Sequence, residues 1–180
     1  TNATLDVLAY DLNQRTPHQT DIERLRQGKV GAQFWSVYIT GQLKDGGYAK
    51  MQLEQIDLAL RMIEQYPDDL SLALTAADIE SAFKAGKIAS LLGMKGGQGM
   101  ESSLGALRTF YRLGVRSMSL THKTNLEWVD AAMDTPQHNG LTDFGETVVK
   151  EMNRLGMLVD LTLASPKTMQ DVLAISEAPI

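Results

Sequence analysis

The sequence predicts an α/β fold built on a parallel β-sheet. Short continuous apolar runs, such as Ile88–Met94, are typical of strands that are buried on both faces. Helical patterns separate these runs, as expected of βαβ units. Three junctions share the order helix, glycine, strand, at Gly86, Gly114 and Gly156. A doubly wound open sheet and part of a (β/α)₈ barrel both fit this order, and periodicity alone does not distinguish them.

Five strands are expected, and each is a run rich in apolar or β-branched residues. The second run contains the aromatic stretch GAQFWSVY, and the third follows directly on a glycine and a lysine. The expected strands are Leu5–Tyr10, Val30–Ile39, Ile88–Met94, Val115–Leu120 and Met157–Leu163.

Five helices are expected between and after these strands. Thr75 and Asp78 form a pattern like a capping box, and Ser165-Pro166 combines an N-cap serine with a proline at the first helical position. Two helices end in Arg-Leu-Gly, which is a frequent helix stop. The expected helices are Tyr48–Tyr66, Thr75–Ala85, Ser102–Leu113, Thr142–Leu155 and one from Ser165 to about Ser176.

The composition narrows the class of function. The chain has 180 residues, a net charge of −5 and a pI near 5.2, which argues against nucleic acid as the main partner. There is no cysteine, so disulfides, thiolate metal sites and a cysteine nucleophile are excluded. No apolar run approaches the length of a membrane span. We therefore expect a soluble protein, with residues 1–180 in a single domain and with no indication of its compartment.

Three long stretches resemble the membrane (renal) dipeptidase family of zinc metallopeptidases, in particular its bacterial-type branch. They are GAQFWSVY at 31–38, the segment 86–122 that begins GKIASLLGMKGGQGM, and the segment 140–180 that begins GLTDFGETVVKE. The resemblance implies a (β/α)₈ TIM-barrel fold with strands one to five present and the remaining strands beyond Ile180. It also implies a family site with two zinc ions that hydrolyses dipeptides.

The resemblance allows each metal position to be compared with this chain. The family's first strand ends in His-x-Asp, and Thr4 and Asp6 stand at these places. Its third strand leads into Gly-x-Glu-Gly-Gly-His, where Lys95 replaces the zinc-bridging glutamate and Gln98 the histidine. Its fifth strand ends in Asp-Leu-x-His, where Leu163 replaces the ligand histidine. Asp6 is thus the only retained metal-ligand position, and we expect no bound zinc although zinc is the family's cofactor.

Other candidate residues follow from the same comparison. His122 stands at the family's substrate-contacting histidine and is the expected substrate-binding residue, whereas His18 and His138 are expected to be solvated. Lys95 is expected to form an ion pair with Asp6 or Asp160, and a lysine nucleophile of lowered pKa is the alternative. The glycine-rich loop that follows Lys95 could also cradle a phosphate, although it lacks the ending of a P-loop.

Three functions remain open. The first is a metal-free, catalytically inactive pseudoenzyme, natural or redesigned, that retains the family scaffold and contacts a dipeptide-like small molecule. The second is a zinc-dependent dipeptidase whose other ligands come from a segment outside this sequence. The third is a structural module, a barrel fragment that pairs with a second barrel half or forms a homo-oligomer, because exposed strand edges demand a partner.

Overall fold

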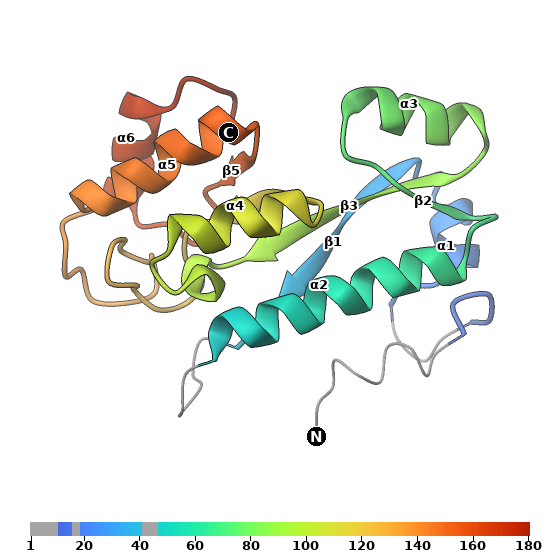
Figure 1. Cartoon of the computed structure of the whole chain (residues 1–180), viewed down its shortest axis with the longest axis horizontal. Coiled ribbons are helices and arrows are strands. Elements are labelled where there is room, and N and C mark those ends of the chain that lie inside the picture. The colour runs from blue at the N-terminus through green and yellow to red at the C-terminus, as the bar shows by residue number, and fades with distance from the viewer. Residues whose placement is uncertain (1–10, 16–18, 41–46) are drawn as a thin grey trace. The chain divides into compact units, whose positions relative to one another are not determined.

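The computed structural model describes residues 11–15, 19–40 and 47–180 (Figure 1). The chain forms two compact units, one of residues 1–35 and 57–91 and one of residues 36–56 and 92–180. The expected first strand, Leu5–Tyr10, lies outside the described residues. Within the described part of the chain no helix is both long and apolar enough to cross a membrane.

The strands form one sheet in which every recorded pairing is parallel, which confirms the predicted α/β class. Its order is β1-β3-β4-β5, and β2 also pairs with β3. The strand β2 has only three residues and was not predicted, because so short a segment shows no periodicity. The bounds are β1 Ala32–Tyr38, β2 Leu70–Leu72, β3 Ile88–Lys95, β4 Val115–Ser119 and β5 Leu158–Asp160.

The first unit contains α1 (Ile22–Gln27) and α3 (Ala76–Lys84). The short helix α1 was not predicted from the sequence, although Asp21 caps it by accepting a hydrogen bond from the Arg24 amide. The predicted capping box of α3 is confirmed, because Thr75 and Asp78 each accept from the other's backbone amide. Two residues of this helix, Ile79 and Ala82, belong to a small apolar cluster that also contains Ala73, Ala89 and Leu91.

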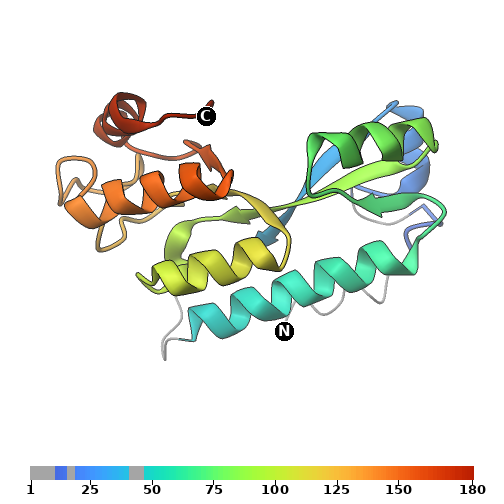
Figure 2. The same cartoon turned by 45° about the horizontal axis from the view of Figure 1, so that its top comes forward.

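The helix α2 (Tyr48–Gln65) has residues in both units. The second unit also holds α4 (Leu104–Arg112), α5 (Asp143–Leu155) and α6 (Pro166–Ile175). The predicted caps are confirmed at Ser165 and at Gly156, whose φ of 77° lies in the left-handed region that glycine favours. Thr142 also caps α5, by accepting from the Gly145 amide. Helix α4 contacts β4 and α5, and α5 contacts β5 and α6, as Figures 1 and 2 show.

The packing of these helices fixes the ends of the strands. Fully buried side chains include Met94, Leu107, Phe110, Met118, Val148 and Met152. The parallel register places Lys95 beside Ser119 and Ser119 beside Asp160. The carboxyl ends of β3, β4 and β5 therefore meet at one edge of the sheet, which is where parallel α/β proteins carry their sites.

Candidate site at the carboxyl ends of β3, β4 and β5

The glycine-rich segment after β3 is a tight turn. Gly96 has a φ of 96°, and a short 3₁₀ helix, η2, follows over Gly97–Met100. The Gly96 amide donates to the Ser119 hydroxyl at 2.8 Å, and the Gly97 amide donates to the Leu120 carbonyl at 3.1 Å. Because both amides already have internal acceptors, they do not form the phosphate cradle considered from the sequence.

Two glycines of this turn are required by close packing. A Cβ at Gly97 would lie 2.6 Å from the Trp128 ring and 2.7 Å from the Leu120 carbonyl oxygen, and one at Gly99 would lie 2.7 Å from the Gln52 side-chain oxygen. Real Cβ atoms do not approach other atoms so closely. The glycines therefore hold the turn against a buried tryptophan and against helix α2.

Lys95 ends β3, and its ammonium lies 2.6 Å from Oδ2 of Asp160 at the end of β5. The other Asp160 oxygen accepts from the Thr162 amide at 2.8 Å. Burial raises the pKa of Asp160, but hydrogen bonds from Lys95 and Thr162 and the charge of Lys95 outweigh it and leave the pKa below its ordinary value. The predicted ion pair is confirmed, with Asp160 as the partner.

His122 follows β4 and lies against Tyr38 at the end of β1. The two ring centroids are 5.0 Å apart, and the rings are tilted by 50°. Burial lowers the pKa of His122, and the charges of Lys123 and Lys95 lower it further. The imidazole is therefore held neutral around pH 7, beside an ion pair and an aromatic ring.

Gln98 and Leu163, which the resemblance matches to two further family histidines, carry an amide and a hydrocarbon side chain. The Gln98 amide nitrogen donates to the Ile39 carbonyl at 3.1 Å, which orients the side chain. Leu163 offers a hydrocarbon side chain, and its backbone has a φ of 65°, which is uncommon for a residue other than glycine. Its carbonyl accepts from the Ala132 amide at 2.8 Å.

The remaining sequence candidates have different outcomes. Thr4, Asp6 and His18 lie outside the described residues, so their placement stays a prediction. The expectation that His138 is solvated is wrong: its Nε2 lies 2.9 Å from the Leu126 carbonyl, and its side chain is half-buried. The cause is the tight folding of the segment between β4 and α5, which periodicity does not reveal.

Asp130 organises that segment, although no feature of the sequence singled it out. It is fully buried, and its carboxylate accepts backbone hydrogen bonds from Gln137, His138 and Gly140 at 2.9–3.2 Å. Burial raises the pKa of Asp130, but these amides and the nearby His138 outweigh it and leave the pKa lowered. Thr168 donates to the Asp130 carbonyl at 2.9 Å, which joins the segment to α6.

These residues do not fit a centre of two zinc ions. Zinc takes nitrogen, sulfur or carboxylate ligands, and an ammonium at close range repels a cation. Lys95 supplies that ammonium, and the Asp160 carboxylate is already paired with it. Leu163 supplies no donor atom. Among the described residues there is no group of three or more His, Cys, Asp or Glu side chains that could hold a metal ion.

The fold and the strand-end site define a parallel α/β protein that carries its site at the carboxyl ends of its strands. The family model for membrane dipeptidases (peptidase family M19) matches residues 2–180, and the chain belongs to this family. It is 44% identical to dipeptidase 3 of Mus musculus over 177 residues, which are 94% of this chain and 35% of that protein. It is 42% identical to the dipeptidase verJ of Clonostachys rogersoniana, over 93% of this chain and 46% of that protein.

A solved structure supports the same fold. The probable dipeptidase PvdM from Pseudomonas aeruginosa superposes with a TM-score of 0.87 at 21% identity, over 96% of this chain and 47% of that one. The chain thus spans less than half the length of these relatives. The match favours the barrel over the doubly wound sheet, a choice that periodicity had left open.

Proposed function

We propose that this chain is a metal-free form of the membrane dipeptidase scaffold that binds a dipeptide-like small molecule without hydrolysing it. The observation that carries the proposal is the 2.6 Å ion pair between Lys95 and Asp160. Its positive charge stands where the family resemblance places a glutamate that bridges two zinc ions. One lysine ammonium thus supplies the positive charge that bound metal would otherwise bring to the strand ends.

Loss of zinc would remove the hydrolytic step. A metal lowers the pKa of bound water, so that hydroxide is available near neutral pH, and it polarises the carbonyl that is attacked. The described residues at the strand ends offer neither effect, because Gln98 and Leu163 replace histidines of the family pattern. The surrounding strands and helices keep the family fold, which supports a scaffold that is retained for another purpose.

Binding of a small peptide-like molecule is supported by the groups around the ion pair. The Lys95 side chain is 35% exposed, so its charge remains available to a carboxylate. The neutral His122 offers both a donor and an acceptor, and the Tyr38 ring beside it is 41% exposed. Together they suit a ligand with one carboxylate and one amide, as in a dipeptide.

The test is a zinc and turnover assay on the full chain. We expect substoichiometric zinc after incubation with two equivalents, measured by elemental analysis after gel filtration, and no hydrolysis of Ala-Ala above the buffer rate. Binding of Ala-Ala should be saturable and should weaken in Lys95→Met. Stoichiometric zinc together with turnover would overturn the proposal and favour the zinc-dependent dipeptidase.

A matched pair of variants sharpens this test. Lys95→Glu combined with Leu163→His restores two family ligands and should raise the zinc content of the protein. Lys50→Glu combined with Leu173→His makes the same chemical changes at exposed positions on α2 and α6 and should not. Equal zinc contents in the two double variants would show that the strand ends are not the site that the proposal assumes.

A second candidate function is a barrel fragment that pairs with another barrel half or with a second copy. Large apolar side chains on two strands favour it, because Phe34 of β1 is 43% exposed and Leu158 of β5 is 47% exposed. Light scattering across a concentration series tests this candidate. A mass of one chain at every concentration would count against self-pairing.

A further inference from the structure

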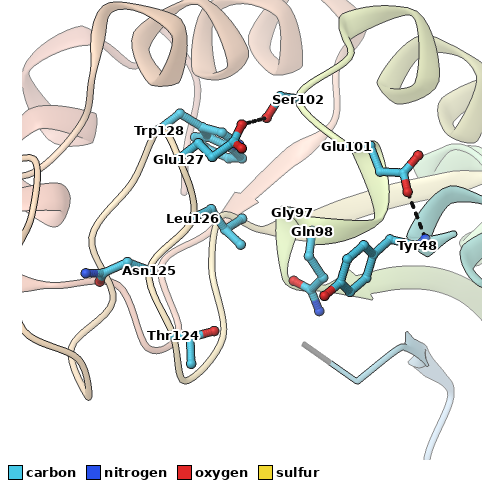
Figure 3. Close-up of a pocket in the computed structure, with 10 residues that line it drawn as sticks. All are labelled: Tyr48, Gly97, Gln98, Glu101, Ser102, Thr124, Asn125, Leu126, Glu127 and Trp128. Atoms are coloured by element: carbon cyan, nitrogen blue, oxygen red, sulfur yellow. Dashed lines mark hydrogen bonds between the residues drawn. The ribbon is translucent and has the colours of Figure 1, made fainter. Parts of the chain in front are cut away.

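A pocket at the amino ends of β1 and β3 differs in charge from a larger pocket beside η2. The larger one, of about 470 Å³, is lined by Tyr48, Glu101 and Glu127 among others, and none of its described lining residues is cationic (Figure 3). The smaller one has a volume of about 210 Å³, below the range of about 300–1,000 Å³ that is typical of drug-sized ligands. It is lined by the segments that join α1 to β1 and α3 to β3, all within the first unit.

Three cationic side chains line the smaller pocket, and no described carboxylate does. They are Arg26, Lys29 and Lys87. Among the described residues, neither Lys29 nor Lys87 has an ion-pair partner. The whole chain carries a net charge of −5, so this excess of positive charge is local. The pocket therefore attracts an anion.

Arg26 is held in place by two partners and still has donors to offer. Its Nε and Nη2 donate to the Asp69 carboxylate, and its Nη1 donates to the Gly86 carbonyl at 3.2 Å. These bonds use three of the five N–H groups of a guanidinium. The other two have no acceptor among the described residues, and the side chain is 47% exposed. Asp69 offsets part of the charge of Arg26, so the two lysines supply most of the attraction and Arg26 supplies donors of fixed direction.

The backbone at the two neighbouring helix ends does not prevent anion binding. Carbonyl oxygens at the C-terminus of a helix carry partial negative charge. At the end of α1, the carbonyls of Leu25 and Arg26 accept from the amides of residues 30 and 29, both at 3.0 Å. At the end of α3, the carbonyls of Ala82 and Phe83 accept from the amides of residues 87 and 86 at 2.9 and 3.0 Å. Because these oxygens are already bonded to internal amides, the full charges of the side chains outweigh them.

Phe83 gives the pocket an apolar wall. Its side chain is 69% exposed, although it is a large aromatic group. The ring lies directly over the backbone of Gly31, where a Cβ would be only 3.0 Å from it. An exposed aromatic ring is stabilised when apolar surface covers it. The pocket therefore suits a small ligand that carries a flat apolar group next to its anionic group.

The number of cations selects the kind of anion. A phosphate monoester carries a charge of about −1.5 to −2 at pH 7 and three strong acceptor oxygens, which match two ammonium groups and one guanidinium. A carboxylate carries a single charge and two oxygens, so it would leave one of the three cations without a partner.

We propose that this pocket binds a small phosphate monoester of an aromatic alcohol. Arg26, Lys29 and Lys87 hold the phosphate, and the ring of the ligand packs on Phe83. The site goes beyond the proposed function, because it uses none of the residues at the carboxyl ends of the strands. Failure of one proposal therefore leaves the other standing.

The experiment is a calorimetric titration of the full chain with phenyl phosphate. Phenol is the uncharged probe, and inorganic phosphate is the probe without a ring. We expect saturable 1:1 binding of phenyl phosphate, weaker binding of inorganic phosphate and none of phenol. Lys87→Met should weaken the binding of phenyl phosphate about tenfold, and Lys29→Met should weaken it less because Lys29 is more exposed. Phe83→Ala should lower the affinity to that of inorganic phosphate.

The control must separate the pocket from the general effect of charge. Lys84→Met removes an equal charge from an exposed position on α3 that does not line the pocket, and it should leave the affinity unchanged. Circular dichroism melts show whether each variant is folded. Absence of saturable binding, equal binding of phenol or of inorganic phosphate, or equal losses in Lys84→Met and Lys87→Met would each overturn the proposal. Loss of phenyl phosphate binding in Lys95→Met would also overturn it, because the anion would then lie at the carboxyl ends of the strands.

Discussion

The ammonium of Lys95 and the carboxylate of Asp160 join the ends of β3 and β5 across the intervening strand β4. Their separation is 2.6 Å, and the parallel register places both beside Ser119. The lysine and aspartate side chains together bridge the two inter-strand spacings of about 4.8 Å each that separate these strands. The pair therefore links the carboxyl ends of β3 and β5, at the edge of the sheet where parallel α/β proteins carry their sites.

Replacing Lys95 by methionine should destabilise the protein by about 1 kcal/mol at pH 7, since the pair is partly exposed and partly screened. The lowered pKa of Asp160 means that its contribution is complete above its ordinary pKa of 3.8 and is lost as the pH falls through the lowered value. Urea unfolding at pH 7 and pH 3 measures both effects. Lys50→Met, at a side chain that is 84% exposed, should change stability much less, and equal losses would contradict this reasoning.

The same substitution should raise the pKa of His122. Lys95 is one of the charges that lower this pKa, after burial and Lys123, so its removal makes protonation of the imidazole easier. An NMR titration of the imidazole ring protons measures the shift. Lys150→Met removes an equal charge from an exposed position on α5 and should leave the pKa unchanged. A lower pKa in Lys95→Met would be inconsistent with the described geometry.

Gly97→Ala should destabilise the protein by about 2–3 kcal/mol, because a Cβ there overlaps the Trp128 ring and the Leu120 carbonyl. Gly105→Ala is the matched control. A Cβ at Gly105, within α4, meets nothing closer than 3.5 Å, so this change should be neutral or stabilise by up to about 1 kcal/mol. Thermal unfolding compares them, and equal effects of the two alanines would refute the packing role of Gly97.

Glu151→Gln tests the electrostatic link between α4 and α5. Glu151 accepts from Arg108 of α4 at 3.0 Å and from Arg154 of α5 at 2.7 Å. The hydrogen bond from Arg154 is the largest influence and, with Arg108, lowers the pKa of Glu151 from 4.5 to about 2 against the opposing effect of burial.

The variant should lose about 1 kcal/mol at pH 7. Because the folded-state pKa is lowered, this difference should be complete above pH 4.5 and should shrink as the pH falls toward 2. Urea unfolding of both proteins over this pH range is the measurement. A difference that grows on acidification would show that Glu151 acts by some other means.

Asp130→Ala should cost about 3 kcal/mol, because it leaves buried backbone amides without an acceptor. The amides of Gln137, His138 and Gly140 all depend on this carboxylate. Hydrogen exchange should show faster exchange at these amides, and chemical denaturation gives the total loss. Asp68→Ala, at an exposed position, should change stability by less than about 0.5 kcal/mol.

Local signals in the sequence were sufficient for much of the fold. The caps at Thr75 and Ser165 and the stop at Gly156 depend on a few neighbouring residues, so they could be predicted directly. The buried runs of β3 and β4 also lay where expected. The short elements α1 and β2 were missed, because six and three residues carry too little periodicity.

The candidate site could be predicted only in part. The assignment of Lys95, Gln98 and Leu163 to the family's metal positions comes from the resemblance and stays a prediction. The choice of Asp160 as the partner of Lys95 required the sheet register, and the buried role of Asp130 required the folded segment between β4 and α5. No spacing in the sequence relates Tyr48 to Glu127 in one pocket.

The sequence by itself determined the α/β class and most element boundaries, because these depend on short-range pattern and residue chemistry. The tertiary structure decided which charges meet, which polar atoms remain unpaired and which glycines are required by contact. Those properties depend on distances between residues far apart in the chain, such as the 2.6 Å from Lys95 to Asp160, and only packing of the helices against the sheet creates them.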